Sequence, residues 1–362
     1  MRAVLTIDLH AIRANYRTLK VQAPRAEVAA VLKADGYGLG CGPIADALIG
    51  EGCRSFFVAT AEEALSLRSK RKGIRIHLLN GPDEQAAPAL AAKKVTPVLN
   101  SPAQIGLWAK TAKTLGQRLP AALHLDTGMC RLGLSEREQS ALDLDHMDAI
   151  GIDLIMSHLA CADEPGHDLN QEQHQAFLQR SGSWPGQRLS LANSAGIFLS
   201  CSFHFDLVRP GIALFGGNPI PEHPNPMSGV VTISAPILQI HQVTKAGSVG
   251  YGASYRTKPG MRIATLGIGY ADGVLRQASN RATATLRDWP VPFAGRVSMD
   301  LIGVDVTDVP ETVLAQTNEV TLLAGDDGID RMAAAANTIP YEVLTRLGPR
   351  LERRYVNGAA SA

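Results

Sequence analysis

The sequence predicts an α/β fold, a (β/α)₈ barrel of the TIM type followed by a mostly β C-terminal domain. Between residues 28 and 215, short apolar runs alternate with longer Ala-rich and charge-rich helical patterns, as in parallel βα units. A proline-rich stretch follows, and the runs beyond it are rich in Val, Ile and Thr. The length of 362 residues fits a barrel and a smaller second domain.

Eight strands are expected at nearly regular spacing in the first part of the chain. Helices between them are indicated by capping residues such as Thr60 and Ser101 and by glycines near the helix ends. Eight such units make a complete barrel, whereas the alternative, an open doubly wound sheet, more often has five or six strands. The expected strands cover residues 28–33, 55–60, 75–80, 95–100, 122–127, 153–159, 188–194 and 207–215.

The second part of the chain begins with a linker. The segment "GGNPIPEHPNPMSG" contains four prolines, and the runs after it predict strands followed by one helix from about residue 330 to 347. We therefore expect the barrel at residues 9–218 and the β-rich domain at residues 219–362. Residues 1–8 are expected to add an N-terminal strand to the β-rich domain.

Composition excludes several classes of function. The net charge is +1, from 35 basic and 34 acidic residues, so no nucleic acid or membrane surface is expected as a partner. Five cysteines without a C-x-x-C pair argue against a disulfide framework and against a zinc site, and no metal site is expected. No apolar stretch reaches the length of a membrane span. A soluble, cytoplasmic protein is predicted.

Polar residues at the expected strand ends indicate the functional site, because active sites of barrels lie at the carboxyl ends of the strands. The set holds a lysine, a histidine and two arginines but almost no free carboxylate. Such a mouth is electropositive and suits an anionic ligand. The residues are Lys33, the cluster from Asp126 to Arg131, His158, Asn193 with Ser194, and Arg209 followed by Gly211.

Lys33 lies in "VLKADGYGLG", which is neither a Walker loop nor a dinucleotide fingerprint, because the lysine precedes the glycines and the third glycine of the fingerprint is missing. A partly desolvated lysine amine is a nucleophile toward carbonyls. If the carbonyl belongs to pyridoxal phosphate, Ser194 and the backbone N–H groups of Gly211 and Ile212 can form the phosphate site, and Tyr37 adds a phenol.

Eight motifs, taken together, resemble those of the alanine racemases, which are pyridoxal-phosphate enzymes built from a barrel and a β domain. The resemblance extends from "IDLHAIRANY" to "YEVLTRLGPR", essentially the whole chain. In order, the motifs are "AVLKADGYGLG", "HLDTGMCRLG", "SHLACAD", "ANSAG", "RPGIALFG", "VGYGASY", "IGYADG" and "GRVSMD".

The resemblance implies a two-base mechanism. Lys33 would carry the cofactor and act as one base, and Tyr251 would be the second base, on the opposite face of the substrate. Tyr251 would come from the other subunit of a homodimer whose active sites are shared. A free phenol has a pKa of about 10, so Tyr251 needs nearby positive charge to act near neutral pH. The resemblance implies that His158 and Arg209 supply that charge.

The remaining roles also follow from the resemblance. Arg209 would contact the pyridine nitrogen of the cofactor. Substrate binding would involve Arg131, Met299 and Tyr270. Cofactor binding would involve Lys33, Tyr37, His158, Asn193, Ser194, Arg209, Gly211 and Ile212.

The chain departs from the family at some positions. His124 stands where well-known members have a carbamylated lysine that orients the arginine seven positions later, so Arg131 must be held in another way. Pro349 stands where some members have a phosphate-binding tyrosine, which leaves the phosphate to Tyr37, Ser194 and the backbone.

The implied activity is the interconversion of L- and D-alanine, which supplies D-alanine for peptidoglycan. Two alternatives stay open. One is a racemase of broader specificity that acts on serine or larger side chains. The other is a non-catalytic pyridoxal-phosphate carrier, although residues 226–362 argue against it, since single-barrel carriers lack a β domain.

Overall fold

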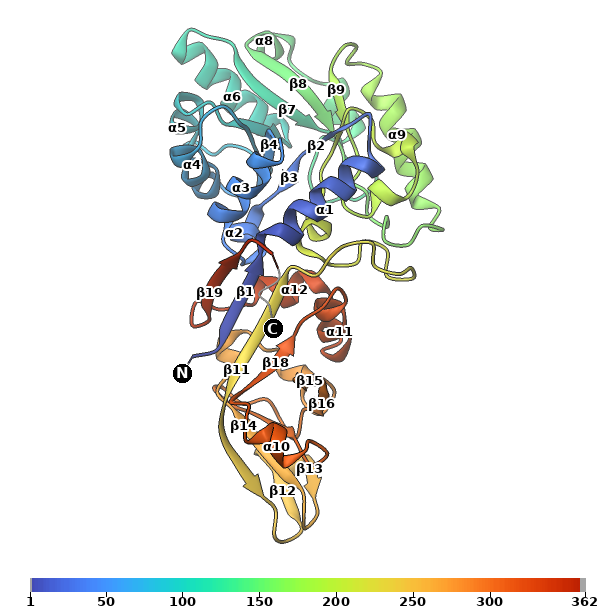
Figure 1. Cartoon of the computed structure of the whole chain (residues 1–362). Coiled ribbons are helices and arrows are strands. Elements are labelled where there is room, and N and C mark those ends of the chain that lie inside the picture. The colour runs from blue at the N-terminus through green and yellow to red at the C-terminus, as the bar shows by residue number, and fades with distance from the viewer. Residues whose placement is uncertain (1, 359–362) are drawn as a thin grey trace.

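The computed structural model describes residues 2–358 and contains the predicted barrel. All eight expected strands form. The first is interrupted at Ala29, and the helices lie on the outside (Figure 1). The strands are β2 (Glu27–Val28) with β3 (Ala30–Val31), β4 (Ser55–Val58), β5 (Arg75–Leu78), β6 (Thr96–Leu99), β7 (Leu119–His124), β8 (Ile150–Met156), β9 (Arg188–Ser190) and β10 (Leu207–Val208).

The barrel closes through β10. Strands β3 to β9 form one sheet in chain order, and β10 pairs with β2 in parallel. The Arg209 N–H donates to the Ala192 carbonyl at 2.9 Å, and the Ala29 N–H donates to the Val208 carbonyl at 3.0 Å, which joins the last strand to both neighbours. Strands such as β4 and β6 are buried along their whole length, which explains their continuous apolar runs.

The helices begin and end as their capping residues predict. Thr60 and Glu63 form a capping box at the start of α4, and the Ser101 side chain accepts from the Gln104 N–H at the start of α6. Gly116 ends α6 in the left-handed conformation. The helices of the barrel region are α1 (Leu9–Gln22), α2 (Lys33–Tyr37), α3 (Cys41–Gly50), α4 (Ala61–Lys70), α5 (Ala87–Ala92), α6 (Pro102–Leu115), α7 (Glu136–Ser140), α8 (Leu144–Asp148) and α9 (Leu169–Ser181).

The last barrel strand is shorter than expected. The sequence predicts a strand over residues 207–215, but β10 ends at Val208 and residues 212–215 form a 3₁₀ turn, η3 (Ile212–Phe215). Pro210 cannot donate to a strand ladder, and the chain turns at Gly211. This turn brings backbone N–H groups to the mouth of the barrel.

The C-terminal sheet also contains the N-terminal strand. β1 (Val4–Asp8) pairs antiparallel with β11 (Val231–Gln242) and parallel with β19 (Glu352–Val356). Residue 1 and residues 359–362 of the expected second domain lie outside the described residues. The other strands of this domain are β12 (Gly247–Val249), β13 (Tyr255–Thr257), β14 (Arg262–Leu266), β15 (Thr283–Leu286), β16 (Trp289–Pro292), β17 (Ile302–Asp305) and β18 (Glu319–Leu323).

The domain does not end in one helix, so that prediction is wrong. A short helix α10 (Glu311–Leu314) comes first, and the expected final helix is divided into α11 (Gly328–Ala335) and α12 (Pro340–Thr345) before β19. Asn337 has a φ of 53°, and Ile339 is extended because it precedes Pro340. Figure 1 shows α11 and α12 beside the barrel and β12 and β13 at the far end of the domain.

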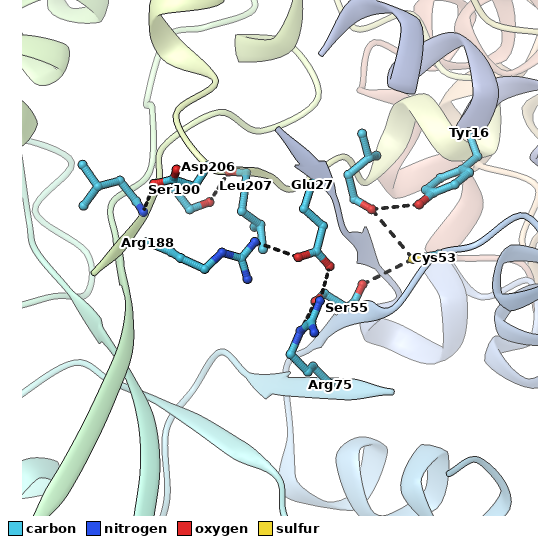
Figure 2. A network of polar contacts seen from close by, with 11 residues as sticks. Tyr16, Glu27, Cys53, Ser55, Arg75, Arg188, Ser190, Asp206 and Leu207 are labelled. Carbon is cyan, nitrogen blue, oxygen red and sulfur yellow. Dashed lines mark hydrogen bonds and ion pairs between the residues drawn. The ribbon is translucent and has the colours of Figure 1, made fainter. Parts of the chain in front are cut away.

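The amino end of the barrel is held by a charged cluster, which we call the Glu27 cluster and define as Glu27, Ser55, Arg75 and Arg188. Each of these residues is the first of its strand. The Glu27 carboxylate accepts from Arg75 and from Arg188, each at 2.7 Å, and Arg75 Nε donates to Ser55 Oγ at 2.9 Å (Figure 2). The cluster ties four strands together.

Among the helices of residues 2–358, none is both long enough and apolar enough to span a bilayer.

Candidate active site

A cavity of about 320 Å³ opens at the carboxyl ends of the barrel strands. Its size is in the range of small-molecule sites. No carboxylate side chain is among the described residues that line it, whereas Lys33, Arg131 and Arg209 bring positive charge. The expected site residues that line it are Lys33, Tyr37, Arg131, His158, Asn193, Ser194, Arg209 and Gly211.

Lys33 lies two residues beyond β3, where the chain turns sharply. Ala34, Asp35 and Gly36 have φ values of 54°, 51° and 64°, a left-handed run that is rare for residues other than glycine. Glu63 stabilises the turn by accepting from the Ala34 N–H at 2.6 Å. The Lys33 side chain is half-buried, and burial together with Arg131 lowers the pKa of its amine. A larger share of neutral amine favours covalent chemistry and proton abstraction.

A cluster of hydrogen-bond donors lies where the sequence predicts a phosphate site. Ser194 Oγ accepts from the Gly211 N–H at 2.8 Å and from the Ala213 N–H at 3.3 Å. A Cβ added at Gly211 would lie 2.1 Å from the Tyr37 hydroxyl, so the close approach of Tyr37 to this turn requires glycine. Hydroxyls and backbone N–H groups gathered on one turn can hold an anion.

Arg209 is buried beneath the cavity without a carboxylate partner among the described residues. It donates to the Ser190 hydroxyl, to the Ser157 carbonyl at 2.5 Å and to the Leu191 carbonyl at 3.2 Å. Its guanidinium also lies 6.0 Å from the centre of the Phe57 ring. Burial lowers the pKa of Arg209, yet the group stays protonated near pH 7. A fixed positive charge therefore faces the cavity.

His158 does not supply positive charge. Its Nδ1 lies 3.4 Å from Arg209 Nη2. Burial and the nearby Arg209 hold the pKa of His158 well below its ordinary value. The imidazole is therefore neutral near pH 7, and the expectation that it adds to the charge of Arg209 is wrong.

Arg131 lies on a well-ordered loop after β7. Asp126 Oδ1 accepts from the backbone N–H groups of Gly128, Met129 and Cys130 at 3.0 to 3.1 Å. Arg180 donates to the Leu134 carbonyl at 2.8 Å. Within residues 2–358 the exposed Arg131 side chain makes no hydrogen bond or ion pair to another side chain, so its charge is available to a ligand carboxylate.

Tyr341 is a cavity residue that the sequence reasoning missed. It lies at the start of α12, and its ring centre is 6.0 Å from that of Tyr37. Tyr341 therefore gives the cavity a second tyrosine besides Tyr37, although Pro349 stands where some family members have one. The signal was present, because Tyr341 opens the "YEVLTRLGPR" motif, but its contact with Tyr37 depends on how the two domains meet.

The structure does not bring Tyr251, Tyr270 or Met299 to the cavity of the same chain. Their side chains are 73%, 44% and 53% exposed on the C-terminal domain. Tyr251 lies in the turn η4 (Tyr251–Ala253) between β12 and β13, and the neighbouring Gly252 lies close to the Arg296 side chain. Tyr270 and Met299 lie together, because the Tyr270 and Ala271 N–H groups donate to the Ser298 and Met299 carbonyls, each at 3.0 Å.

The cavity residues fit pyridoxal phosphate. A half-buried lysine can bind its carbonyl carbon, and the Ser194, Gly211 and Tyr37 cluster offers donors to a phosphate. Arg209 also lines the cavity. Arg131 remains for the carboxylate of a substrate.

Comparisons with known proteins cover nearly the whole chain. The family model for the N-terminal domain of alanine racemase matches residues 7–219, and the model for its C-terminal domain matches residues 230–355. The chain is 47% identical over 357 residues to alanine racemase of Rhodospirillum rubrum, covering 98% of this chain and 96% of that protein. It is 44% identical over 360 residues to a catabolic alanine racemase of Agrobacterium fabrum, covering 99% and 93%.

Solved structures agree. Alanine racemase of Bartonella henselae with covalently bound pyridoxal phosphate superposes with a TM-score of 0.91 at 40% identity, covering 98% of this chain and all of that one. Alanine racemase of Streptomyces coelicolor superposes with a TM-score of 0.92 at 33% identity, covering 99% and 98%.

Proposed function

The chain belongs to the alanine racemase family, and from this premise we propose that it interconverts L- and D-alanine with pyridoxal phosphate held at the mouth of the barrel. The observation that carries the proposal is the cavity in which Lys33, Arg131 and Arg209 meet without a carboxylate among the described residues. Such a cavity favours a ligand that is both anionic and electrophilic.

We assign cofactor binding to the residues of the cavity. Lys33 would bind the cofactor covalently, and His158, Asn193 and Arg209 would surround its ring. Tyr37, Ser194 and Gly211 would hold its phosphate, together with the backbone of Ile212, which follows Gly211 at the start of η3 and is not itself among the described lining residues. When bound, pyridoxal phosphate acidifies the Cα–H bond of an amino acid by delocalising the negative charge.

Racemisation needs one proton donor and acceptor on each face of the substrate. Lys33 is suited to one face, because burial and Arg131 lower the pKa of its amine and favour the neutral form. Tyr251 would serve the other face. Arg209 keeps a fixed positive charge at the site, which stabilises negative charge on the substrate or on a phenolate.

The active site would be completed by a second copy of the chain. Tyr251 is 73% exposed on the C-terminal domain and is not among the described residues that line the cavity of its own chain, as expected for a residue that serves another subunit. Tyr270 and Met299 would come with it and narrow the space beside the substrate. In a twofold dimer the two sites would then be equivalent.

Alanine is the proposed substrate, with its carboxylate bound by Arg131. The relatives reported above are named for alanine, and none supports the alternative of broader specificity. Their names include both a plain and a catabolic form, so supply of D-alanine for peptidoglycan is our proposal for the role in the cell. All five cysteines are unpaired, which fits a reducing cytoplasm, where we propose that the protein acts.

The absorption spectrum of the purified protein tests the proposal, together with racemisation of L-alanine. We expect a visible absorption band from lysine-bound cofactor, and we expect Lys33→Ala to abolish both the band and the activity. A colourless protein that still racemises alanine would contradict the proposed cofactor. A faster reaction with serine or lysine than with alanine would contradict the proposed substrate.

A further inference from the structure

We propose that Glu63 is a positioning residue for Lys33, whose carboxylate ties the turn that carries the lysine to the end of the neighbouring strand β4 and places a negative charge near the lysine amine. The inference rests on the proposed function, in which Lys33 binds the cofactor and transfers a proton. Lys33 lines the cavity, whereas Glu63 is not among the described lining residues. Glu63 would therefore act on the reaction only through Lys33.

The turn after Lys33 needs partners outside itself. Three of its residues other than glycine lie in the left-handed region, where the backbone is strained and persists only if the surrounding structure holds it. They are Ala34 (φ 54°), Asp35 (φ 51°) and Tyr37 (φ 58°). Glu63 Oε1 accepts from the Ala34 N–H at 2.6 Å and from the Asp35 N–H at 3.4 Å. One carboxylate oxygen thus holds the first two N–H groups after the lysine.

The other carboxylate oxygen binds the next unit of the barrel. Glu63 Oε2 accepts from the Ala59 N–H at 2.8 Å and from the Thr60 N–H at 3.3 Å, and these residues follow β4 directly. Thr60 Oγ1 in turn accepts from the Glu63 N–H at 3.3 Å, which fixes the backbone from which the side chain extends. The carboxylate therefore joins the end of β4 to the turn after β3.

A second capping box shows that such a bridge is not a general property of these boxes. Glu138 forms a box with Ser135 at the start of α7, as Glu63 does with Thr60 at the start of α4. Glu138 Oε2 accepts from the Ser135 N–H at 2.9 Å and from Ser135 Oγ at 2.8 Å. Within residues 2–358, the hydrogen bonds of the Glu138 carboxylate stay inside its own box. Glu63 uses one oxygen for its box and the other for the Lys33 turn.

The charge of Glu63 also reaches the Lys33 amine. Burial and the nearby Arg131 lower the pKa of the amine, and Glu63 opposes them by raising it. His158, another titratable neighbour of Lys33, is neutral near pH 7. Glu63 therefore limits the net fall in the pKa, and removing its charge should lower the pKa of the amine further.

Glu63→Gln removes the negative charge and one of the two acceptor oxygens, so the side chain can no longer serve both loops. Glu138→Gln is the matched control, because it makes the same change in a box that does not touch the Lys33 turn. We expect amide hydrogen exchange in peptides that cover residues 33–37 to be about 10-fold faster or more in Glu63→Gln, and unchanged in Glu138→Gln. This readout does not depend on turnover. Equal exchange in all three proteins would overturn the inference.

Steady-state rates of the holoenzyme test the effect on the reaction. We expect Glu63→Gln to lower kcat for L-alanine by about 5-fold or more while KM changes less than about 3-fold, because a displaced amine impairs proton transfer and not carboxylate binding. Glu138→Gln should leave both constants unchanged. A smaller loss of kcat in Glu63→Gln, or an equal loss in Glu138→Gln, would overturn the inference.

The pH dependence of cofactor attachment separates the charge of Glu63 from a purely structural role. Added pyridoxal phosphate reacts with the neutral amine, so its attachment to the cofactor-free full chain, followed by the visible band, should accelerate as pH rises through the pKa of Lys33. We expect the midpoint of this profile to lie at lower pH in Glu63→Gln. It should be unchanged in Glu138→Gln and in Glu63→Asp, which keeps the charge. An equal or higher midpoint in Glu63→Gln would overturn the inference.

The outcomes for the unchanged protein keep the two proposals apart. If it lacks bound cofactor or does not racemise alanine, the proposed function fails. If it does both and Glu63→Gln behaves like Glu138→Gln in all three measurements, only the role of Glu63 fails. Should Glu63→Gln not fold, Glu63→Asp decides, because its side chain is one methylene too short to reach both loops. A loss of kcat of about 5-fold or more in Glu63→Asp supports the inference, and a smaller loss overturns it.

Discussion

Charged side chains are arranged in opposite ways at the two ends of the barrel. At the amino end, the Glu27 carboxylate lies between Arg75 and Arg188, and each ion pair is 2.7 Å long (Figure 2). At the carboxyl end, Lys33, Arg131 and Arg209 line one cavity without a carboxylate among the described residues. The two sets lie at opposite ends of the strands of the same barrel.

The difference separates stability from function. Charges that meet their partners within the chain hold strands together, as the Glu27 cluster does for four of them. Charges left without partners disfavour the folded state on their own and become favourable only with a ligand. This division matches the general pattern of these barrels, whose active sites lie at the carboxyl ends of the strands.

The largest effect is expected for Tyr251→Phe, which removes the phenol proposed to complete the carboxyl end. We expect proton abstraction from L-alanine to fall by about 10²-fold to 10⁴-fold, the usual contribution of a general acid or base. The rate of proton abstraction from D-alanine, which we assign to Lys33, should fall less. Single-turnover rates with substrate that carries either deuterium or hydrogen at Cα check this. Equal losses in the rate of Cα–H abstraction from L-alanine and from D-alanine would show that the assignment of the two faces is wrong. The overall kcat/KM values must fall together in the two directions, because the two enantiomers have the same free energy.

Acid should destabilise the protein through buried histidines. Burial lowers the pKa of His77 to about 3 and that of His124 to about 4, and it lowers the pKa of His158 well below its ordinary value. Below about pH 6.5 the unfolded chain binds protons that the folded chain does not, so stability falls as pH falls.

Each of the three histidines should lower the free energy of unfolding by about 1.4 kcal/mol per pH unit between pH 6.5 and its folded pKa. Urea unfolding at pH 7, 6 and 5, at one protein concentration, measures the slope. A free energy of unfolding that stays constant over this range would contradict neutral histidines in the folded state.

Glu27→Gln should weaken the ion pairs at the amino end of the barrel without changing the cavity at the carboxyl end. We expect a loss of about 1–3 kcal/mol in the free energy of unfolding, because two arginines lose their partner at a partly buried site. Racemisation at 25 °C should be unchanged once the cofactor is bound. Urea unfolding at pH 7 and a rate assay on the same preparation check both. A change in the racemisation rate without a change in the free energy of unfolding would contradict our assignment of the amino end to stability and of the carboxyl end to function.

The Glu27 substitution should also change how stability depends on pH. Burial alone would raise the pKa of Glu27, but hydrogen bonds from Ser55 and Arg75 and the contact with Arg188 lower it below 4.5. Its stabilisation is therefore present above about pH 4.5 and is lost as pH falls through the lower folded pKa. The difference between Glu27→Gln and the unchanged protein should shrink toward pH 3.

Arg75→Gln should have the smallest effect. The Arg75 side chain is 48% exposed, and Glu27 keeps Arg188 as a partner. We expect a loss of about 1 kcal/mol or less, as for other exposed ion pairs. A loss as large as that of Glu27→Gln, measured in the same urea series, would show that Arg75 and not Arg188 carries the cluster.

Much of the barrel could be predicted from the sequence, because alternating apolar runs and capping residues act locally. Thr60 and Ser101 cap helices where they were expected. The sequence analysis did not predict the break before Pro340 or the short β10, although a proline restricts the backbone locally and Pro340 and Pro210 indicate where both elements end. Pattern alone overestimates the length of elements that end at such turns.

Site residues that follow barrel strands could be predicted from the sequence, whereas those that reach the cavity through the contact between the two domains could not. Lys33, Arg131 and Arg209 follow barrel strands, so the topology brings them to one mouth. Tyr341 comes from α12 and reaches Tyr37 only because the C-terminal domain packs on the barrel. The neutral state of His158 likewise depends on burial beside Arg209, which no spacing in the sequence reveals.

The most direct test of the account is a mixing experiment with Lys33→Ala and Tyr251→Phe, each of which we expect to have little activity alone. If the barrel mouth of one subunit uses Tyr251 of the other, a mixed dimer has one site with both residues intact. Random exchange of subunits should then restore about a quarter of the activity of the unchanged protein. Activity that stays at the level of the separate variants, after exchange has been verified, would contradict a site shared between subunits.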